Sequence, residues 1–170
     1  MELGWRFGSL DALGYVHGQY AGWRWQSREK EALCLPGFTP EHDRPYPLSA
    51  QEAEKHLKAG TCTCGLYVLD RPVWDVYTVY KSIRVGDLED IRIPRWRFNH
   101  NEWGCPASIS VSYWGAVSEH KSDEIESPVK RVQFARIEAI VLPDDVDTMR
   151  LIAARIAYNV PVMRLSEYAH

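Results

Sequence analysis

The clearest alternation of apolar and polar positions lies between Ser108 and Ser118. Ile109, Val111 and Tyr113 fall on one face of an extended chain, and the serines at 108, 110 and 112 fall on the other. A strand with one buried face produces this period of two residues. Gly115, directly after Trp114, predicts a β-bulge in this strand, because glycine readily adopts the positive φ that many bulges require.

The run from Val129 to Leu142 has β-branched residues near both ends, which favours a second strand over a helix. Charged residues between 121 and 127 separate the two runs, so we expect a hairpin. Shorter strands are expected at Leu66–Leu69 and at Val160–Met163, the latter at a sheet edge because it contains a proline. Aromatic residues interrupted by glycines between Leu3 and Gln26 indicate further short strands and turns.

Two helices are predicted before the hairpin. The sequence SAQE at residues 49–52 matches a capping box, and its helix is expected to run to about Lys58, just before a glycine. Asp70 is placed to cap a second helix that has Pro72 in its first turn. The apolar positions of this second helix, spaced near 3.6 residues, are Val73, Trp74, Tyr77 and Tyr80.

A third helix is predicted after the hairpin. Asp144 and Asp145 are expected to start it, because their charges suit the positive end of the helix dipole, and Asn159 is expected to end it. One stripe of this helix is apolar and is expected to face the core. The stripe consists of Met149, Ile152, Ala153 and Ile156.

Together these elements predict an α+β fold for the 170 residues, as a single domain over residues 1–170. We expect a mostly antiparallel, curled sheet with about three helices and a structural zinc site. Within the domain, residues 34–64 comprise an irregular proline-rich loop followed by a helix. Residues 143–163 comprise the C-terminal helix and its short strand.

Composition and charge exclude several classes of protein. The chain is 45% hydrophobic and 25% charged, as ordinary globular proteins are and disordered ones are not. Its net charge of −3 is evenly mixed, which gives little support for nonspecific binding to nucleic acid. No apolar stretch approaches the roughly 20 residues of a membrane span, and the N-terminus lacks a signal-peptide pattern, so we expect a cytoplasmic location and no membrane partner. No catalytic or phosphate-binding motif is present, so no catalytic or cofactor-binding residue is assigned and an enzyme is not favoured.

The strongest chemical signal is the pair Cys62 and Cys64, which flank one threonine. Gly65 permits the sharp turn that would let both thiolates reach one metal ion. Reduced cysteines in a cytoplasmic protein are metal ligands or buried thiols before they are disulfides. Zinc takes four tetrahedral ligands, usually thiolate sulfur or imidazole nitrogen.

Two further ligands would complete a structural zinc site. Cys34, at the end of the proline-rich loop, is the expected third ligand, and the site would then tie this loop to the core. His56, on the helix that leads into the cysteine pair, is the expected fourth ligand, with His42 and Cys105 as alternatives. The competing interpretation is that all four cysteines are small buried apolar residues.

Two short motifs resemble an uncharacterised family of actinobacteria and their phages. They are residues 62–67 (CTCGLY) and residues 112–120 (SYWGAVSEH), and the similarity extends over roughly residues 22–163. The resemblance implies the fold and the metal site rather than an activity. It also implies an arginine-containing strand, in which Arg131 or Arg136 would be that arginine.

One position departs from this family pattern. The family has a histidine and a proline shortly before its cysteine pair, whereas His56 is followed by Leu-Lys-Ala-Gly-Thr. The family's histidine position is therefore open to His56 or His42.

Three functions follow in order of preference. The first is a non-enzymatic, zinc-stabilised binding or regulatory protein, which the resemblance suggests is phage-encoded and acts on a host protein. The second is a nucleic-acid-binding regulator that uses the Arg92–Phe98 patch, where Trp96 would stack on bases while Arg95 and Arg97 meet phosphates. The competing interpretation of that patch is a strand with solvated arginines.

The third function is a zinc-dependent hydrolase. Glu119 and His120 are adjacent in the predicted strand and therefore point to opposite faces, so they cannot easily share one proton. His120 and Trp114 remain candidate contact residues for a partner.

The zinc site predicts about one zinc ion per chain in protein purified without chelator, measured by elemental analysis. Cys64→Ser is expected to unfold or insolubilise the chain, because structural zinc contributes roughly 10–16 kcal/mol in small peptides. Far less than one equivalent of zinc, or a Cys64→Ser variant that melts at the wild-type temperature, would exclude a structural metal.

Overall fold

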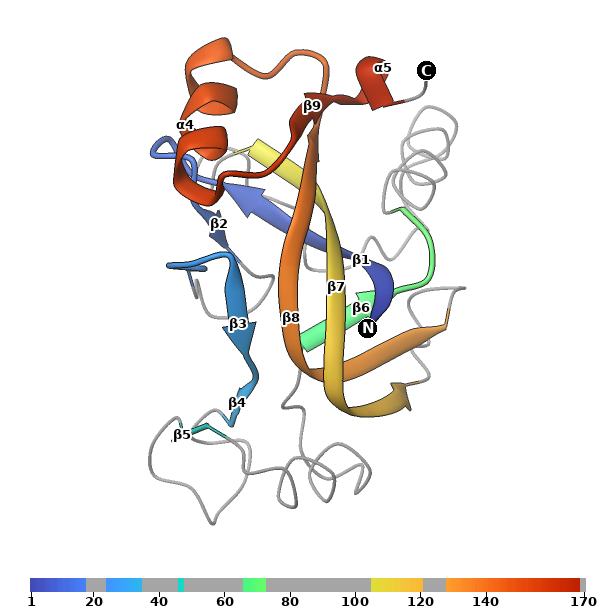
Figure 1. Cartoon of the computed structure of the whole chain (residues 1–170). Coiled ribbons are helices and arrows are strands. Elements are labelled where there is room, and N and C mark those ends of the chain that lie inside the picture. The colour runs from blue at the N-terminus through green and yellow to red at the C-terminus, as the bar shows by residue number, and fades with distance from the viewer. Residues whose placement is uncertain (18–23, 35–45, 48–65, 73–104, 121–127, 169–170) are drawn as a thin grey trace, which may run out of the picture.

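The protein is described by a computed structural model in which residues 1–17, 24–34, 46–47, 66–72, 105–120 and 128–168 are placed (Figure 1). The strands are β1 (Glu2–Leu10), β2 (Val16–His17), β3 (Glu29–Glu31), β4 (Leu33–Cys34), β5 (Tyr46–Pro47), β6 (Leu66–Leu69), β7 (Cys105–His120), β8 (Val129–Leu142) and β9 (Val162–Arg164). The helices in these residues are α4 (Thr148–Tyr158) and α5 (Leu165–Tyr168). Seven strands form one sheet, while β4 and β5 pair with each other.

The long β7–β8 hairpin is the frame of this sheet, as the alternation of residues predicts. β1 pairs antiparallel with the first part of β7, from Glu2 opposite Tyr113 to Leu10 opposite Cys105. β6 pairs antiparallel with the start of β8 and also meets β1, where Leu69 lies opposite Trp5. The four strands β1, β7, β8 and β6 therefore pair in a closed ring, which confirms the predicted curled and mostly antiparallel sheet (Figure 1).

Strands from the two ends of the chain complete the sheet. β2 pairs with the end of β1, and β3 pairs with β8 beyond the part that β6 occupies. β9 runs parallel to β8, with Val162 opposite Ile140. The predicted short strand is therefore present, but it begins at Val162, after the proline, rather than at Val160. Because β1 and β9 belong to the same sheet, the described residues form one body.

Two bulges bend the hairpin. Trp114 lies opposite Phe134 and Val117 opposite Val132, so β7 uses one more residue than β8 in this interval. Gly115, with φ +83°, occupies this bulge and confirms the prediction. The second register shift lies between Ser110 and Val111 of β7, where the partner strand β8 carries one more residue.

The side chains around the Gly115 bulge are only partly as expected. Tyr113 is buried, but Trp114 is half-buried and stacks on Phe134, with ring centroids 5.7 Å apart. The polar face of β7 also differs, because Ser108 and Ser112 are buried rather than solvated. Ser112 satisfies its hydroxyl by donating to Glu138 Oε1 at 2.6 Å.

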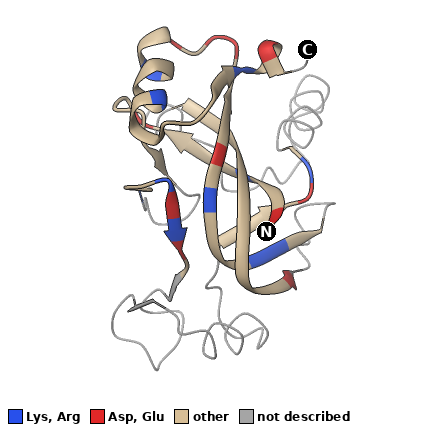
Figure 2. Ribbon diagram, in the orientation of Figure 1, with Lys and Arg blue, Asp and Glu red and all other residues tan. Residues whose placement is uncertain are grey.

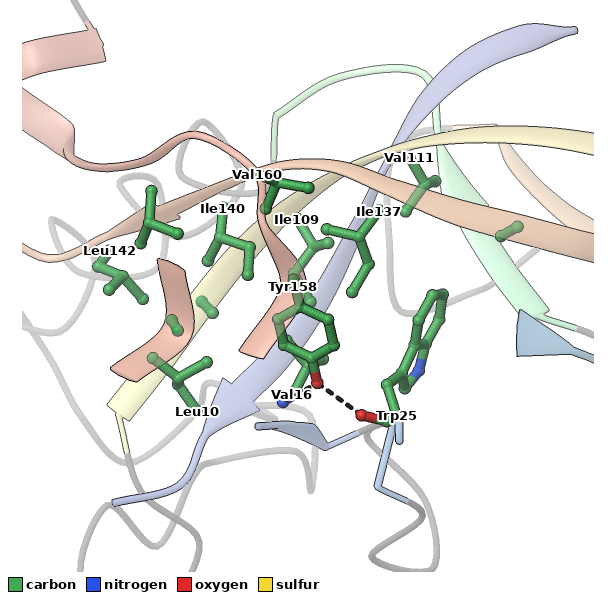
Figure 3. Packing of buried hydrophobic residues seen from close by; sticks show 14 of the residues in the cluster. Leu10, Val16, Trp25, Ile109, Val111, Ile137, Ile140, Leu142, Tyr158 and Val160 are labelled. Carbon is green, nitrogen blue, oxygen red and sulfur yellow. Dashed lines mark hydrogen bonds between the residues drawn. The ribbon is translucent and has the colours of Figure 1, made fainter. Parts of the chain in front are cut away.

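The core fills the concave side of the curled sheet (Figure 3). Ile109 and Val111 of β7 are buried, as predicted, and they meet Ile137 and Ile140 of β8. Trp25, from the segment between β2 and β3, is 2% exposed and belongs to the same cluster. Burying an aliphatic side chain such as that of Ile109 or Ile137 contributes about 1.5–3 kcal/mol. This cluster is therefore a large source of the fold's stability.

α4 confirms the predicted third helix but begins later than predicted. The helix begins at Thr148, and Asp147 is its N-cap, with a side chain that accepts from the amide of Arg150 at 2.8 Å. Asp144 is not in the helix, because its carboxylate accepts from the amide of Ser166 at 2.9 Å. Asn159 ends the helix in the left-handed conformation, as predicted.

The predicted inward stripe of α4 is wrong. The residues of α4 that are buried are Leu151, Ala154 and Tyr158. Met149, Ile152 and Ile156 are exposed instead. The helix has two overlapping apolar stripes, and the shorter one, which ends in a large aromatic residue, packs on the sheet.

Several expected elements fall outside the described residues. The helix predicted over residues 49–58 and the apolar positions 73–80 of the second predicted helix lie there, as does the turn of the hairpin. Two residues of the predicted irregular loop form a strand instead, because Tyr46–Pro47 pairs with Leu33–Cys34. The short helix α5 was not predicted.

The Gly115 bulge predicts that Gly115→Val destabilises the protein by about 1–3 kcal/mol, the scale of local backbone strain. A Cβ at this position would meet Gln133 Oε1 and Phe134 Cδ2, each at 2.8 Å, on a backbone that L side chains rarely adopt. Thermal melts measure the effect. Glu119→Val on the same strand is the control and should change stability little, and a Gly115→Val melting temperature at or above that of wild type would contradict the prediction.

Candidate functional site

The candidate site is an exposed apolar stripe on α4. We name Met149, Ile152 and Ile156 the α4 stripe. Their exposed fractions are 74%, 41% and 79%, respectively. Residues at positions i, i+3 and i+7 share one face of a helix, so these three side chains form a continuous surface. A contiguous group of large aliphatic side chains in water indicates a contact surface, whereas single exposed apolar residues are common.

The opposite face of α4 holds the helix firmly against the sheet (Figure 3). The hydroxyl of Tyr158 accepts from the amide of Val16 at 2.8 Å and donates to the carbonyl of Trp25 at 2.6 Å. Burial raises the pKa of Tyr158 to about 12, so the hydroxyl keeps its proton at any physiological pH. The α4 stripe is thus presented by an anchored element.

The turn between β1 and β2 packs beside the α4 stripe. Gly14 lies against the backbone of α4, where a Cβ would be 2.3 Å from the carbonyl carbon of Ala153. Asp11 stabilises the turn, because its Oδ1 accepts from the amides of Leu13 and Tyr15, each at 2.9 Å. Leu13, the residue before Gly14, is 67% exposed.

The charges around the stripe are of both signs (Figure 2). α4 itself carries Arg150 and Arg155 and no acidic residue. The connection before it carries three exposed acids, Asp144, Asp145 and Asp147. Arg155 donates from Nε and Nη2 to the carbonyl of Val162, at 3.0 and 2.7 Å, which ties α4 to β9.

A polar cluster joins the first residues of β1 and β8 to the middle of β7. The hydroxyl of Tyr113 donates to Glu2, and Lys130 donates to that hydroxyl at 2.9 Å. Lys130 also lies 3.4 Å from Asp70, and the bond to Tyr113 raises the pKa of Lys130 above its ordinary value. Tyr113 is buried, and its hydroxyl bonds to both Glu2 and Lys130, so the cluster joins β1, β7 and β8.

Most of the residues predicted for a metal site lie outside the described part of the chain. His56, Cys62, Cys64 and the alternative His42 lie outside it, and only the backbone of Cys34 is described, paired with Tyr46. Cys105 is described and buried, and its thiol donates to the carbonyl of Pro106 at 3.4 Å. Burial raises the pKa of Cys105 to about 11. Among the described residues, no three His, Cys, Asp or Glu side chains are grouped to hold a metal ion.

The predicted contact residues are also only partly described. Arg95, Trp96 and Arg97 lie outside the described residues, and of His120 only the backbone is placed, opposite Val129. Trp114 packs on Phe134 and is half-buried. Trp114 and His120 both lie on β7, whereas the α4 stripe lies on a helix.

The implied strand arginine has two possible positions, both on β8. Arg131 is buried, while the Nε of Arg136 lies 3.7 Å from Glu138.

The α4 stripe was not predicted as a site from the sequence, because Met149, Ile152 and Ile156 were assigned to the core. The sequence does contain an indication of this surface. A second set of residues with helical spacing, Leu151, Ala154 and Tyr158, could also face the core, and it is the set that is buried.

Comparison with known proteins found no counterpart. No protein-family model, no curated protein and no solved structure matches this chain. In the described residues, no helix combines the length and the apolar character needed to cross a membrane.

Tyr158→Phe is predicted to destabilise the protein by about 1–3 kcal/mol, because it leaves the buried amide of Val16 and carbonyl of Trp25 unsatisfied. Hydrogen exchange should become faster along α4, and the melting temperature should fall. Tyr168→Phe, at a tyrosine that is 42% exposed, is the control and should leave both unchanged. Unaltered exchange in α4 of Tyr158→Phe would show that the apolar contacts alone hold the helix.

Proposed function

We propose that this protein is a non-enzymatic binding protein whose α4 stripe docks a partner protein. The observation that carries the proposal is the exposure of Met149 and Ile156, each more than two-thirds exposed on an anchored helix. A helix that presents apolar side chains at i, i+3 and i+7 matches the spacing by which helices are recognised in apolar grooves. The anchoring supports the proposal further, because a surface that is already ordered loses little entropy on binding.

The α4 stripe is the centre of an interface rather than the whole of one. Full burial of two or three such side chains contributes roughly 3–9 kcal/mol, at about 1.5–3 kcal/mol each. Association costs an estimated 4–15 kcal/mol, so further contacts are needed for stable binding. Leu13 and the exposed polar residues around α4 are positioned to supply them.

The chemistry of the surface favours a protein over other partners. The stripe is aliphatic and the whole chain is acidic, with a net charge of −3, which is unfavourable for nucleic acid. The acids at 144, 145 and 147 would be repelled by an anionic lipid surface. We infer a protein partner with an apolar groove or helix.

The zinc site remains a separate proposal for stability. If Cys34, His56, Cys62 and Cys64 bind zinc, the ion would stabilise the domain that presents α4. It would take no part in the docking chemistry. The host-protein partner and the phage origin likewise remain proposals, supported by the two short motifs alone.

The double substitution Met149→Gln and Ile156→Gln tests the docking surface. Gln has at least the helix propensity of Ile, so the helix should keep its stability while the surface loses its apolar character. A photo-crosslinker at position 152 in the source cells would identify the partner, and titration would then measure affinity. We expect the double variant to bind at least about tenfold more weakly, which corresponds to 1.4 kcal/mol.

Leu3→Thr provides the matched control, because Leu3 is 72% exposed on β1 rather than on α4. It should bind as wild type does. Equal affinity of the double variant and wild type would contradict the proposal. A concentration-dependent dimer that the double variant dissolves would instead assign the stripe to a second copy of the chain, and binding to anionic vesicles would assign it to a lipid surface.

A further inference from the structure

An aromatic pair lies beside an acidic edge strand on the outer face of the sheet, the face turned away from the core. Trp114 of β7 lies opposite Phe134 of β8, and Phe134 lies opposite Glu31 of β3. Residues directly opposite each other in paired strands project from the same face of a sheet. Ala135, the next residue of β8, is fully buried in the core, so Phe134 projects from the outer face. The three side chains therefore form one row across three strands, here named the aromatic row.

The two rings of the aromatic row are stacked and half-buried. Their centroids lie 5.7 Å apart and their planes differ by 12°, so each ring covers part of one face of the other. Gly115, which follows Trp114, is exposed and forms the bulge of β7. The stack and the bulge hold the indole in one orientation, which lowers the entropy lost when a ligand packs on it.

β3 carries two glutamates on the outer face (Figure 2). Glu31 belongs to the aromatic row, and Glu29 lies opposite Arg136, two residues further along β8. Glu29 is exposed and Glu31 is half-buried. Lys30 lies between them and projects to the other face, where its Nζ donates to the carbonyl of Arg24 at 3.1 Å. Within the described part of the chain, no cation lies within ion-pair distance of either carboxylate.

The two arginines near these glutamates bond to a different carboxylate. Arg28 donates from Nη2 to Glu138 Oε2 at 2.6 Å and from Nε to the carbonyl of Ile137 at 2.7 Å. The Nε of Arg136 lies 3.7 Å from Glu138 Oε1, which also accepts from Ser112 at 2.6 Å. The positive charge of this group is therefore directed at Glu138, and the two glutamates of β3 keep their negative charge beside the aromatic row.

We propose that the aromatic row and Glu29 form a docking surface for a basic segment of a partner protein. A Lys or Arg side chain of that segment would pack on Trp114 while the two glutamates of β3 pair with its charge. An indole is the side chain that attracts a cation over its face most strongly, and guanidinium groups also stack on aromatic rings. Tryptophan is also enriched among the residues that contribute most to protein interfaces. The surface goes beyond the α4 stripe, which lies on a helix and is apolar.

The competing role of the aromatic pair is structural only, as packing that stabilises the hairpin beside its bulge. NMR titration with a capped (Arg-Ala)₅ peptide distinguishes the two roles. The readout is the indole ¹⁵Nε1–H resonance of Trp114, assigned by its absence from Trp114→Phe. We expect a saturable shift in wild type. The double substitution Glu29→Gln and Glu31→Gln should weaken the apparent affinity about fivefold, because it removes two ion pairs and leaves the rings in place.

Asp145→Asn combined with Glu119→Gln is the matched control, because it removes two negative charges from exposed positions outside the aromatic row. This control should keep the wild-type affinity, and both double variants should keep the wild-type melting temperature. Equal weakening in the two double variants, or none in either, would leave the aromatic pair with only its structural role. An unshifted Trp114 resonance, or an equal shift with a capped (Asp-Ala)₅ peptide, would also overturn the proposal.

Discussion

The closure of β1, β7, β8 and β6 into a ring of paired strands is the constraint on which the remaining structure depends. Four strands can close only if the long hairpin bends sharply, and the bulge at Gly115 provides that bend. β8 then offers its outer edge to three partners in turn, β6, β3 and β9. The strand near the N-terminus and the last strand are brought into one sheet by this single bent hairpin.

The same geometry decides what is exposed on α4. Tyr158 of α4 packs at the end of the sheet where β1 is followed by β2. Its hydroxyl accepts from the amide of Val16 and donates to the carbonyl of Trp25. Once Tyr158 is inside, the helix rotation is set, and the α4 stripe must face outward. The exposed surface is therefore a consequence of the buried one.

β1 carries a buried cation, Arg6, on the face that packs on the core. Arg6 is 9% exposed, its Nη1 donates to the carbonyl of Tyr67 at 2.8 Å, and its Cζ lies 5.6 Å from the centre of the Trp25 ring. Replacing a buried ion by an apolar residue often stabilises a protein, so a retained buried cation needs a role of its own. The bond to Tyr67 is one such role, since Trp5 and Leu69 are the single register pair between β1 and β6 in the part of the chain that the structure describes.

The sequence by itself determined the local structure where pattern and backbone chemistry are strong. The hairpin strands follow from β-branched and alternating residues, the bulge from Gly115 and the end of α4 from Asn159. Those features depend on neighbours in the chain, so they can be predicted from it. The start of α4 was placed too early because several acids precede the helix, and only Asp147 has the geometry of a cap.

Only the tertiary structure decided which apolar residues are buried and which polar groups meet. Met149, Ile152 and Ile156 have the spacing of a buried helix face. The face of Leu151, Ala154 and Tyr158 is buried instead, because the Tyr158 hydroxyl also bonds the amide of Val16 and the carbonyl of Trp25. Likewise, Arg6 lies 61 residues from Tyr67, its hydrogen-bond acceptor. Such choices depend on shape and on partners distant in sequence, and a periodic pattern contains neither.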